Sequence, residues 1–386
     1  MDRRPQAWKT VLTCRDKTMS APLGVSIIVV NYNNERFLAA AIDSALGQAH
    51  PLCEVIVVDD CSTDNSRRVI ARYGDRIKSV LLETNLGQIA ATNSAWPLAR
   101  YPILIFLDSD DLLFPYVAAS VATIWTDATV KVQYPLAVID KAGRQLGPVT
   151  PKYPPNLDTV MIRAEILRTG GSPNSPGSGN AYSRSLVDQV HASGGFELKN
   201  PRDISMDTIL ECNAPFYGEV VTMYEPLACY RVHDSNDSMA YAVDKARFDK
   251  MSRYFACKLD YLVGRCQIWG VRFDPVAARN CSIWSLECRL IADKLSAARD
   301  PLGEPVWRTL SRALKACIHT PLPLSNRIIR AIWLVGVAIG PQVFARRLIA
   351  LRFVITQRSA WFEWFLTTVV NITAWRGSAR IHAPDS

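Results

Sequence analysis

The feature that most constrains the fold is an apolar run that ends in acids. Residues 103–111 read Ile-Leu-Ile-Phe-Leu-Asp-Ser-Asp-Asp, which places Asp108, Asp110 and Asp111 within four positions. An uninterrupted apolar run of this kind predicts a strand that is buried on both faces of a sheet. Open α/β sheets bind ligands at the carboxyl ends of their strands. Carboxylates this close together repel one another, so they indicate a site for Mg²⁺ or Mn²⁺, although an Asp-rich helix cap would give the same pattern.

Two earlier apolar runs end in the same way. Residues 25–30 lead into the polar residues 31–35, and residues 54–58 lead into the polar residues 59–64. Both runs have the length and the β-branched composition of buried strands. We therefore expect three strands whose polar carboxyl ends lie close together.

Helical segments separate these strands along the chain. Apolar residues recur at helical spacing over residues 36–48 and 66–73, and a further strand is predicted near residues 77–83. Alternation of strands with helices predicts right-handed crossovers and a largely parallel sheet. Such a sheet brings the three polar strand ends to one edge.

These segments resemble the inverting glycosyltransferases of family 2, which have the GT-A fold. The resemblance covers about residues 24–240, and its motifs occur in family order and at family spacing. The motifs are Ser26-Ile-Ile-Val-Val-Asn-Tyr-Asn, Val57-Val-Asp-Asp-Cys-Ser-Thr-Asp, Asn85-Leu-Gly-Gln and Phe106-Leu-Asp-Ser-Asp-Asp. It implies an α/β fold with a mixed, mostly parallel sheet flanked by helices. It also implies a nucleotide-sugar donor bound across the first half of the domain, with a divalent metal on its diphosphate.

Positions in the first two motifs and the fourth are implied to bind the donor nucleoside. Tyr32 matches the aromatic residue that lies against the base, and Asp60 matches the acid that accepts a hydrogen bond from it, usually from uracil. Asp108 matches a contact to the ribose or to the outer shell of the metal. Glu35, which ends the first polar segment, belongs to the same expected donor-binding set. Asp59 is expected to cap the following helix or to support the loop.

The third and fourth motifs contribute the loop and the metal site. Gly87 permits close approach of the backbone to a ligand, and Gln88 is expected to contact the donor. The resemblance implies that Asp110 is the direct metal ligand and that His233 is a further contact to the metal or the diphosphate. A lone histidine is also commonly a structural hydrogen-bonding group. Asp111 is expected to begin the next helix, either as a cap or with a chemical role.

The second half of the domain is expected to hold the acceptor and the catalytic base. Inversion at the anomeric carbon requires a carboxylate that removes the proton of the acceptor hydroxyl. Asp207, at an expected helix start, resembles this base. The family's usual Glu-Asp pair is absent, because Met206 stands where the Glu is common. Asp203 is therefore the alternative candidate for the base. Helix capping is the alternative role for Asp207. Arg231 fits either a phosphate contact or a solvent-facing strand position.

A segment rich in turn-forming residues lies between the two halves of the domain. Residues 170–180 contain too many glycines, prolines and serines for regular structure. Such a segment suits a loop that orders over the donor, and it suits a plain surface loop equally well. Its last residues, 178–180, resemble a family segment on the acceptor side.

We expect four parts in the chain. Residues 1–22 are predicted to be a disordered basic tail without an apolar secretory core, and residues 23–240 to be the GT-A domain. A helical appendage is expected over residues 241–320, followed by basic amphipathic helices over residues 321–386. The 10 cysteines include no Cys-x-x-Cys pair and are typical of reduced thiols in the cytoplasm.

The last part of the chain is strongly basic. Residues 321–386 contain eight arginines against one glutamate and one aspartate. Their apolar run at residues 331–345 is broken by Gly340-Pro341 and is shorter than the roughly 20 residues that span a bilayer. Helices in a membrane interface, which would place the protein peripherally on the inner face of the plasma membrane, are one expectation. A partner-docking or intramolecular helix pair is the other. Nucleic acid is not an expected partner, because large apolar residues separate the arginines.

Two classes of function fit the sequence. The first is an inverting glycosyltransferase that moves a sugar, with a UDP-sugar favoured as donor, to a saccharide or lipid-linked acceptor in cell-surface glycan synthesis. The second is a non-catalytic homologue that binds sugar nucleotides or glycans. The retained acids Asp60, Asp108 and Asp110 favour the enzyme. A nucleotidyltransferase is less compatible, because residues 31–35 are not a Gly-rich phosphate loop.

Overall fold

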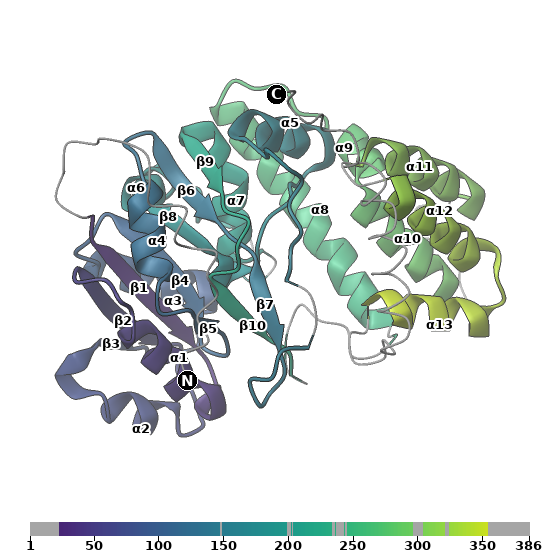
Figure 1. Ribbon diagram of the computed structural model, residues 1–386. Helices are drawn as coiled ribbons and strands as arrows, with labels where there is room; N and C mark the ends of the chain where they lie inside the picture. Colours follow the sequence, from purple (N-terminus) through teal and green to yellow (C-terminus); the bar gives the residue numbers. More distant parts are fainter. Residues whose placement is uncertain are drawn as a thin grey trace, which may run out of the picture.

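The computed structural model describes residues 23–353 with several gaps, and Figure 1 shows an α/β region followed by a group of helices. The gaps are residues 147–148, 199–201, 203, 234–235, 237–242, 244, 296–303 and 321–323. The predicted basic tail, the alternative base Asp203 and residues 354–386 therefore lie outside the described residues.

The main sheet of the described chain has seven strands in the order β3-β2-β1-β4-β8-β6-β9. Strand β1 pairs in parallel with both β2 and β4, and β8 is antiparallel to its neighbours β4 and β6. The predicted mixed and mostly parallel sheet is therefore confirmed. The strands are β1 (Val25–Asn31), β2 (Cys53–Asp59), β3 (Lys78–Leu81), β4 (Ile103–Asp108), β6 (Thr129–Gln133), β8 (Asn180–Ser183) and β9 (Glu219–Thr222).

The register of the central strands aligns their polar ends. Asn31 at the end of β1 lies beside Asp59 of β2, and the neighbouring Val30 lies beside Asp108 of β4. Parallel strands in this register deliver their following loops to one edge of the sheet. The predicted gathering of polar strand ends is confirmed.

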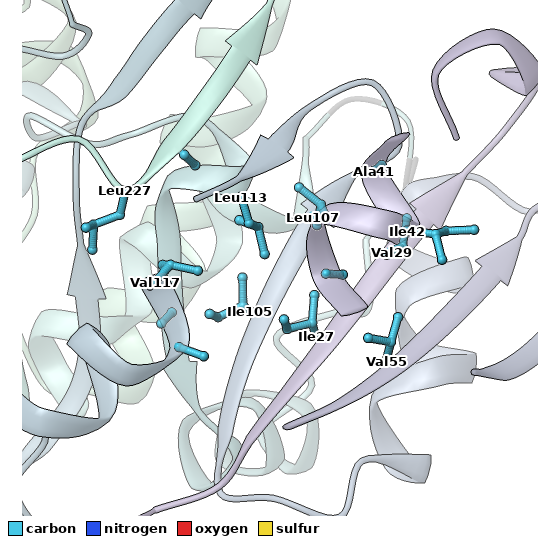
Figure 2. Close-up of a cluster of buried hydrophobic side chains, with 14 of the residues drawn as sticks. Ile27, Val29, Ala41, Ile42, Val55, Ile105, Leu107, Leu113, Val117 and Leu227 are labelled. Atoms are coloured by element: carbon cyan, nitrogen blue, oxygen red, sulfur yellow. The ribbon is translucent and has the colours of Figure 1, made fainter. Parts of the chain in front are cut away.

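Helices cover both faces of this sheet. Strand β1 contributes Ile27 and Val29 to one buried cluster and Ile28 to another, because alternate side chains of a strand point to opposite faces. Figure 2 shows the first cluster, in which Ile42 and Val117 pack against the strands. The helices of this region are α1 (Glu35–Leu46), α2 (Ser66–Ala71), α3 (Gln88–Ala95), α4 (Val117–Ile124), α5 (Thr159–Thr169), α6 (Arg184–Ala192) and α7 (Met206–Tyr217).

A second, three-stranded sheet begins with β5, the strand that follows β4 along the chain. It has the order β5-β10-β7, with β5 (Leu112–Leu113), β7 (Leu136–Ile139) and β10 (Ala228–Arg231). The backbone N–H of Arg231 donates to Asp111 Oδ1 at 2.8 Å. The expectation that Asp111 begins a helix is wrong, because β5 follows it and α4 starts only at Val117. Asp111 instead binds the strand that leads to His233.

The described part of the chain after residue 244 is helical. Its helices are α8 (Lys245–Ile268), α9 (Pro275–Cys281), α10 (Ile283–Leu295), α11 (Val306–His319), α12 (Leu324–Ile339) and α13 (Gln342–Phe353). Val337 of α12 and Ile349 of α13 pack with Phe248 of α8 in one buried cluster. The last two helices therefore pack within the molecule, as one of the two expectations had it. The boundaries predicted at residues 240 and 320 stay predictions.

The described helices are short or polar compared with membrane-spanning segments. None of them combines the length and the apolar character that crossing a bilayer requires.

Candidate active site

Asp59 organises the loop that follows β2. Its Oδ1 accepts a hydrogen bond from Asn31 Nδ2 at 2.7 Å, and its Oδ2 accepts from the backbone N–H of Ser62 at 3.0 Å and from Arg67 Nε at 3.1 Å. Asp59 is fully buried. Of its two expected roles, support of the loop is the observed one.

Asp60 ties the Asn85-Leu-Gly-Gln loop to the end of β2. Its Oδ1 accepts a hydrogen bond from the N–H of Leu86 and its Oδ2 one from the N–H of Gly87, both at 2.8 Å. Gly87 has φ +87°, a backbone conformation that glycine adopts without strain. The predicted contact from Asp60 to a nucleobase stays a prediction, and the lone pairs left by these two bonds are available for it. Sequence reasoning missed the tethering role.

Tyr32 and Glu35, which are also expected to bind the donor, differ in whether their side chains already have hydrogen-bond partners. Tyr32 is 49% exposed at the end of β1, so its ring is open to a flat ligand. Glu35 is also exposed, but its Oε2 accepts a hydrogen bond from the N–H of Asn65 at 2.5 Å and its own N–H donates to Asp64 Oδ2 at 2.9 Å. Glu35 therefore holds the loop after β2 against α1. Its expected donor contact stays a prediction.

A small pocket lies where the two halves of the α/β region meet. Gln88 spans it, donating from Nε2 to Asp108 Oδ1 at 3.3 Å and accepting at Oε1 from the N–H of Met206 at 3.4 Å. Asp108 and Asp207 thus line one pocket although they come from opposite halves. The lining residues are Val30, Gln88, Thr92, Phe106, Asp108, Gly177, Tyr182, Met206 and Asp207.

The turn-rich segment 170–180 closes the pocket behind Asp108. Ser178 Oγ accepts a hydrogen bond from the backbone N–H of Asp108 at 3.1 Å. A Cβ placed on Gly177 would stand 2.9 Å from Asp108 Oδ2, so a larger residue there would have to displace the Asp108 carboxylate. The segment therefore belongs to the site, where the sequence left a plain surface loop as an equal alternative.

The carboxylates of the pocket destabilise one another. Burial raises the pKa of Asp108 to about 7, with further contributions from the charges of Asp110 and Asp207, while the hydrogen bond from Gln88 acts in the opposite direction. Burial also raises the pKa of Asp207, and the charge of Glu211 adds to this effect. Both acids are thus poised to gain a proton or a cation.

Asp110 and His233 form a contact between the two sheets. His233 Nε2 lies 2.8 Å from Asp110 Oδ2, and the imidazole is 5% exposed. The ring also packs against Phe37, with 4.8 Å between the centroids. The nearby Asn236, which sequence reasoning overlooked, accepts a hydrogen bond from the N–H of His233 at 2.5 Å. The polar loop after His233 was the only signal for it.

The side chain of Arg231 supports the loop of residues 108–111, which carries the three acids. Its Nε donates to the backbone carbonyl of Asp110 at 2.7 Å and its Nη1 to that of Asp140 at 3.2 Å, while the side chain is 5% exposed. Neither expected role of Arg231 holds, because the guanidinium faces backbone carbonyls instead of solvent or an open phosphate site. In the sequence, the signal for this supporting role is the position of Arg231, two residues before His233.

The loop of residues 108–111 carries the acids that are expected to hold a metal ion. Among the described residues, no three His, Cys, Asp or Glu side chains come together in a geometry that would hold an ion. Asp110 and His233 nevertheless bring an oxygen and a nitrogen donor together, beside the carboxylate of Asp108. Mg²⁺ commonly takes one or two carboxylates and completes its shell with substrate phosphates and water. The donor set therefore fits a cation that arrives with a diphosphate.

Asp207 stands in the first turn of α7, as predicted, with Ser205 as the N-cap residue. Helix α8 runs along α7 and contacts it through polar side chains. Tyr254 Oη lies 2.8 Å from Ser205 Oγ and also bonds Thr208, while Lys258 Nζ donates to Glu211 Oε2 at 2.9 Å. The helix of the candidate base is thus fastened at its first two turns.

The same row of α8 continues for two more contacts. Asn213 Nδ2 donates to Tyr261 Oη at 2.6 Å, and its Oδ1 accepts from Arg265 Nε at 2.9 Å. Residues 254, 258, 261 and 265 share one face of the helix, because they are three or four positions apart. We call these contacts the α7–α8 seam. Sequence reasoning missed it, since the spacing shows a polar face but not its partner.

Buried lysines compensate the acid of the seam. Burial raises the pKa of Glu211, but the charges of Lys258 and Lys131 outweigh it, and the pKa is lower than usual. Lys131 is 2% exposed, and burial lowers its pKa to about 8. It donates to Asn174 Oδ1 at 2.6 Å and to Gln133 Oε1 at 3.1 Å. A neutralised charge cluster therefore lies one helical turn behind Asp207.

Comparison with known proteins places this site in a family. The family model described as Glycosyl transferase family 2 matches residues 26–190. An uncharacterized glycosyltransferase of Nostoc sp. is 35% identical over 227 residues, which are 56% of this chain and 67% of the relative. The chain therefore belongs to glycosyltransferase family 2. Its mostly parallel sheet and C-terminal helices are the GT-A arrangement that the sequence motifs implied.

Two further proteins resemble parts of the chain more distantly. The WfgD protein of Escherichia coli, a UDP-Glc:alpha-D-GlcNAc-diphosphoundecaprenol beta-1,3-glucosyltransferase, is 40% identical over 89 residues, covering 23% of this chain and 35% of WfgD. The crystal structure of S. aureus TarS 1-349 with UDP-GlcNAc aligns with 94% of this chain and 95% of that chain at 16% identity and a TM-score of 0.47. A likeness at this TM-score is too distant to assign a ligand.

Proposed function

We propose that the chain transfers a sugar, with inversion, from a nucleoside-diphosphate donor to a hydroxyl of a saccharide or lipid-linked acceptor in cell-surface glycan synthesis. The observation that carries the proposal is that Asp108 and Asp207, one from each half of the domain, line a single pocket. A donor site and a base that meet in this way suit attack of an acceptor on a bound sugar.

The donor would lie along the edge of the sheet. Tyr32 offers an exposed ring for the base, and Asp60 fixes the glycine loop beside it. Asp110 and His233 would hold a divalent cation on the diphosphate, with Asp108 in its outer shell or on the ribose. When bound, the cation would neutralise charge that develops on the leaving diphosphate.

Asp207 is the proposed base. Its carboxylate would take the proton of the acceptor hydroxyl while the hydroxyl oxygen bonds to the anomeric carbon of the sugar. The bond between that carbon and the diphosphate oxygen breaks at the same time, so the nucleoside diphosphate leaves and the configuration inverts. A raised pKa makes the carboxylate a stronger base, and Asp207 has a raised pKa because it is buried.

A uridine nucleotide and a lipid-linked acceptor are the preferred substrates. Asp60 stands where the family motif places the acid that pairs with uracil, and the E. coli relative is named for a UDP-Glc donor and a diphosphoundecaprenol acceptor. Such an acceptor places the reaction at the cytoplasmic face of a membrane.

Thermal shift with UDP-sugars tests the donor and metal assignments. We expect stabilisation of the wild-type protein by a UDP-sugar with Mn²⁺, and loss of the Mn²⁺-dependent part in Asp110→Asn. The matched control is Asp188→Asn, because Asp188 lies on α6 away from the pocket. An equal Mn²⁺ effect in Asp110→Asn would remove Asp110 from the metal site. Binding of every donor without transfer or hydrolysis would favour the non-catalytic homologue instead.

A further inference from the structure

Helix α12 carries an apolar face that points away from the rest of the protein. The side chains of Leu324, Ile328, Ile332, Val335 and Ile339 are between 37% and 73% exposed. Their spacing of three and four residues places them on one side of the helix. Figure 1 shows α12 and α13 on the side of the helical group that is far from the main sheet.

The opposite side of α12 makes the contacts that pack this helix against the rest of the protein. Leu334 and Val337 are fully buried, in the clusters that include helices α8 and α10. Trp333 Nε1 donates to the backbone carbonyl of Leu348 at 2.8 Å and so joins α12 to α13. The exposed side chains are therefore additional to the core of the described chain, and nothing within residues 23–353 that the structure describes covers them.

Helix α13 extends this surface. Val343 is 72% and Phe344 51% exposed, and the Phe344 ring lies so close to Gly340 that a Cβ there would stand 2.9 Å from it. Arg346 and Arg347 follow directly and are exposed. We call this surface the α12–α13 face, and it consists of the five α12 side chains above, Val343 and Phe344.

The charged residues of α12 and α13 themselves are all of one sign. Residues 324–353 contain five arginines and no lysine, aspartate or glutamate. Arg330 Nε and Arg352 Nη2 pair with the two carboxylate oxygens of buried Glu287, at 2.9 and 2.7 Å. Arg346 and Arg347, in contrast, are exposed beside the apolar side chains. Packing against a second copy would bring these cations together, which is unfavourable.

We propose that the α12–α13 face lies in the interface of a membrane that contains anionic phospholipid. The apolar side chains enter the boundary of the acyl chains, and Arg346 and Arg347 meet the lipid phosphates. The inference concerns a surface far from the pocket and does not depend on the transfer reaction.

Co-sedimentation of the full-length protein with vesicles tests the proposal. The probes are vesicles of phosphatidylcholine alone and of phosphatidylcholine mixed with phosphatidylglycerol. The disrupting variant is Ile332→Gln/Ile339→Gln, because these side chains are 67% and 73% exposed and their replacement leaves the core intact. The matched control is Val160→Gln/Val276→Gln, which removes side chains that are 72% and 68% exposed on α5 and α9.

We expect binding to the mixed vesicles that falls as salt is added. The Ile332→Gln/Ile339→Gln variant should bind at least roughly tenfold more weakly, since burial of one isoleucine contributes about that factor. The control should bind like the wild type, and Arg346→Gln/Arg347→Gln should lose the preference for anionic vesicles. Failure of the full-length protein to bind either vesicle would overturn the proposal. So would a concentration-dependent dimer in light scattering that the isoleucine variant abolishes.

Discussion

Two groups of acids in this protein differ in how their charge is compensated. Asp108 and Asp207 line one pocket, and both have a raised pKa: the charges of Asp110 and Asp207 add to the effect of desolvation on Asp108, and the charge of Glu211 adds to it on Asp207. Glu211, four residues after Asp207, pairs with Lys258 and has a lowered pKa. Glu211 is the more buried of these acids, yet its pKa is the one that is lowered, so burial alone does not set the direction of the shift. An acid held by its own cation stays ionised without a ligand, whereas acids with a raised pKa are candidates for binding a proton or a cation.

The largest expected effect comes from Asp207, whose pKa is raised although the charge of Lys258 acts against the rise. Asp207→Asn should lower kcat by about 10³-fold, because a positioned general base contributes roughly 10² to 10⁴. Donor affinity should stay within about twofold of the wild type, since uncharged Asn keeps the shape of the pocket. Transfer assays and donor titration measure the two quantities, with Asp188→Asn as the surface control. A large loss of donor affinity would show that Asp207 has a structural role like that of Glu211.

The converse test removes the cation from the balanced group. Lys258→Met should cost about 3–5 kcal/mol in the free energy of unfolding, because it removes the ion-pair partner of buried Glu211 and leaves only the more distant charge of Lys131 to compensate it. Adding Glu211→Gln to this variant should restore most of the loss. Urea unfolding measures both variants. A loss below about 1 kcal/mol would mean that water already compensates Glu211, and the contrast between the two groups would not hold.

The α7–α8 seam connects the two groups, and two tyrosines separate its effects on stability and catalysis. Tyr254 bonds Ser205 at the start of α7, while Tyr261 bonds Asn213 more than a turn beyond Asp207. Each Tyr→Phe change should cost about 1 kcal/mol in the free energy of unfolding. Only Tyr254→Phe should also lower kcat severalfold, by loosening the first turn of α7. An equal effect of both variants on kcat would deny the seam any role in positioning Asp207.

The smallest expected effect is a dependence of stability on pH. The folded-state pKa of Asp207 is raised, so its ionisation costs stability as the pH rises through that value. The variant Asp207→Asn does not ionise and should melt about 1–3 °C higher than the wild type near pH 8. The difference should vanish below about pH 3, under the ordinary aspartate pKa, where the aspartate is protonated in the folded and unfolded states alike. A Tm difference that is constant with pH would exclude ionisation as its cause.

Several features of the fold followed directly from local sequence. The apolar runs before Asn31, Asp59 and Asp108 are strands because side chains of that kind suit burial on both faces of a sheet. Gly87 adopts the positive φ for which glycine is suited, and α7 begins immediately before Asp207. These features depend on neighbouring residues in the chain, and so a single sequence reveals them.

Other roles depend on partners from distant parts of the chain. Asp111 was expected to cap a helix, yet it accepts a hydrogen bond from the backbone of Arg231, 120 residues away. Arg231 was expected to face solvent or phosphate, and it binds backbone carbonyls instead. Both errors come from assigning a polar side chain to its nearest neighbours along the chain.

The sequence by itself determined the alternating strands and helices, the family and the position of the acids at strand ends, because periodicity and local motifs carry that information. Only the tertiary structure decided which acids have a basic side chain beside them. Lys258 reaches Glu211 across 47 residues, and His233 reaches Asp110 across 123. The state of a buried charge depends on the groups that packing brings within a few ångströms, and spacing along the chain does not contain those distances.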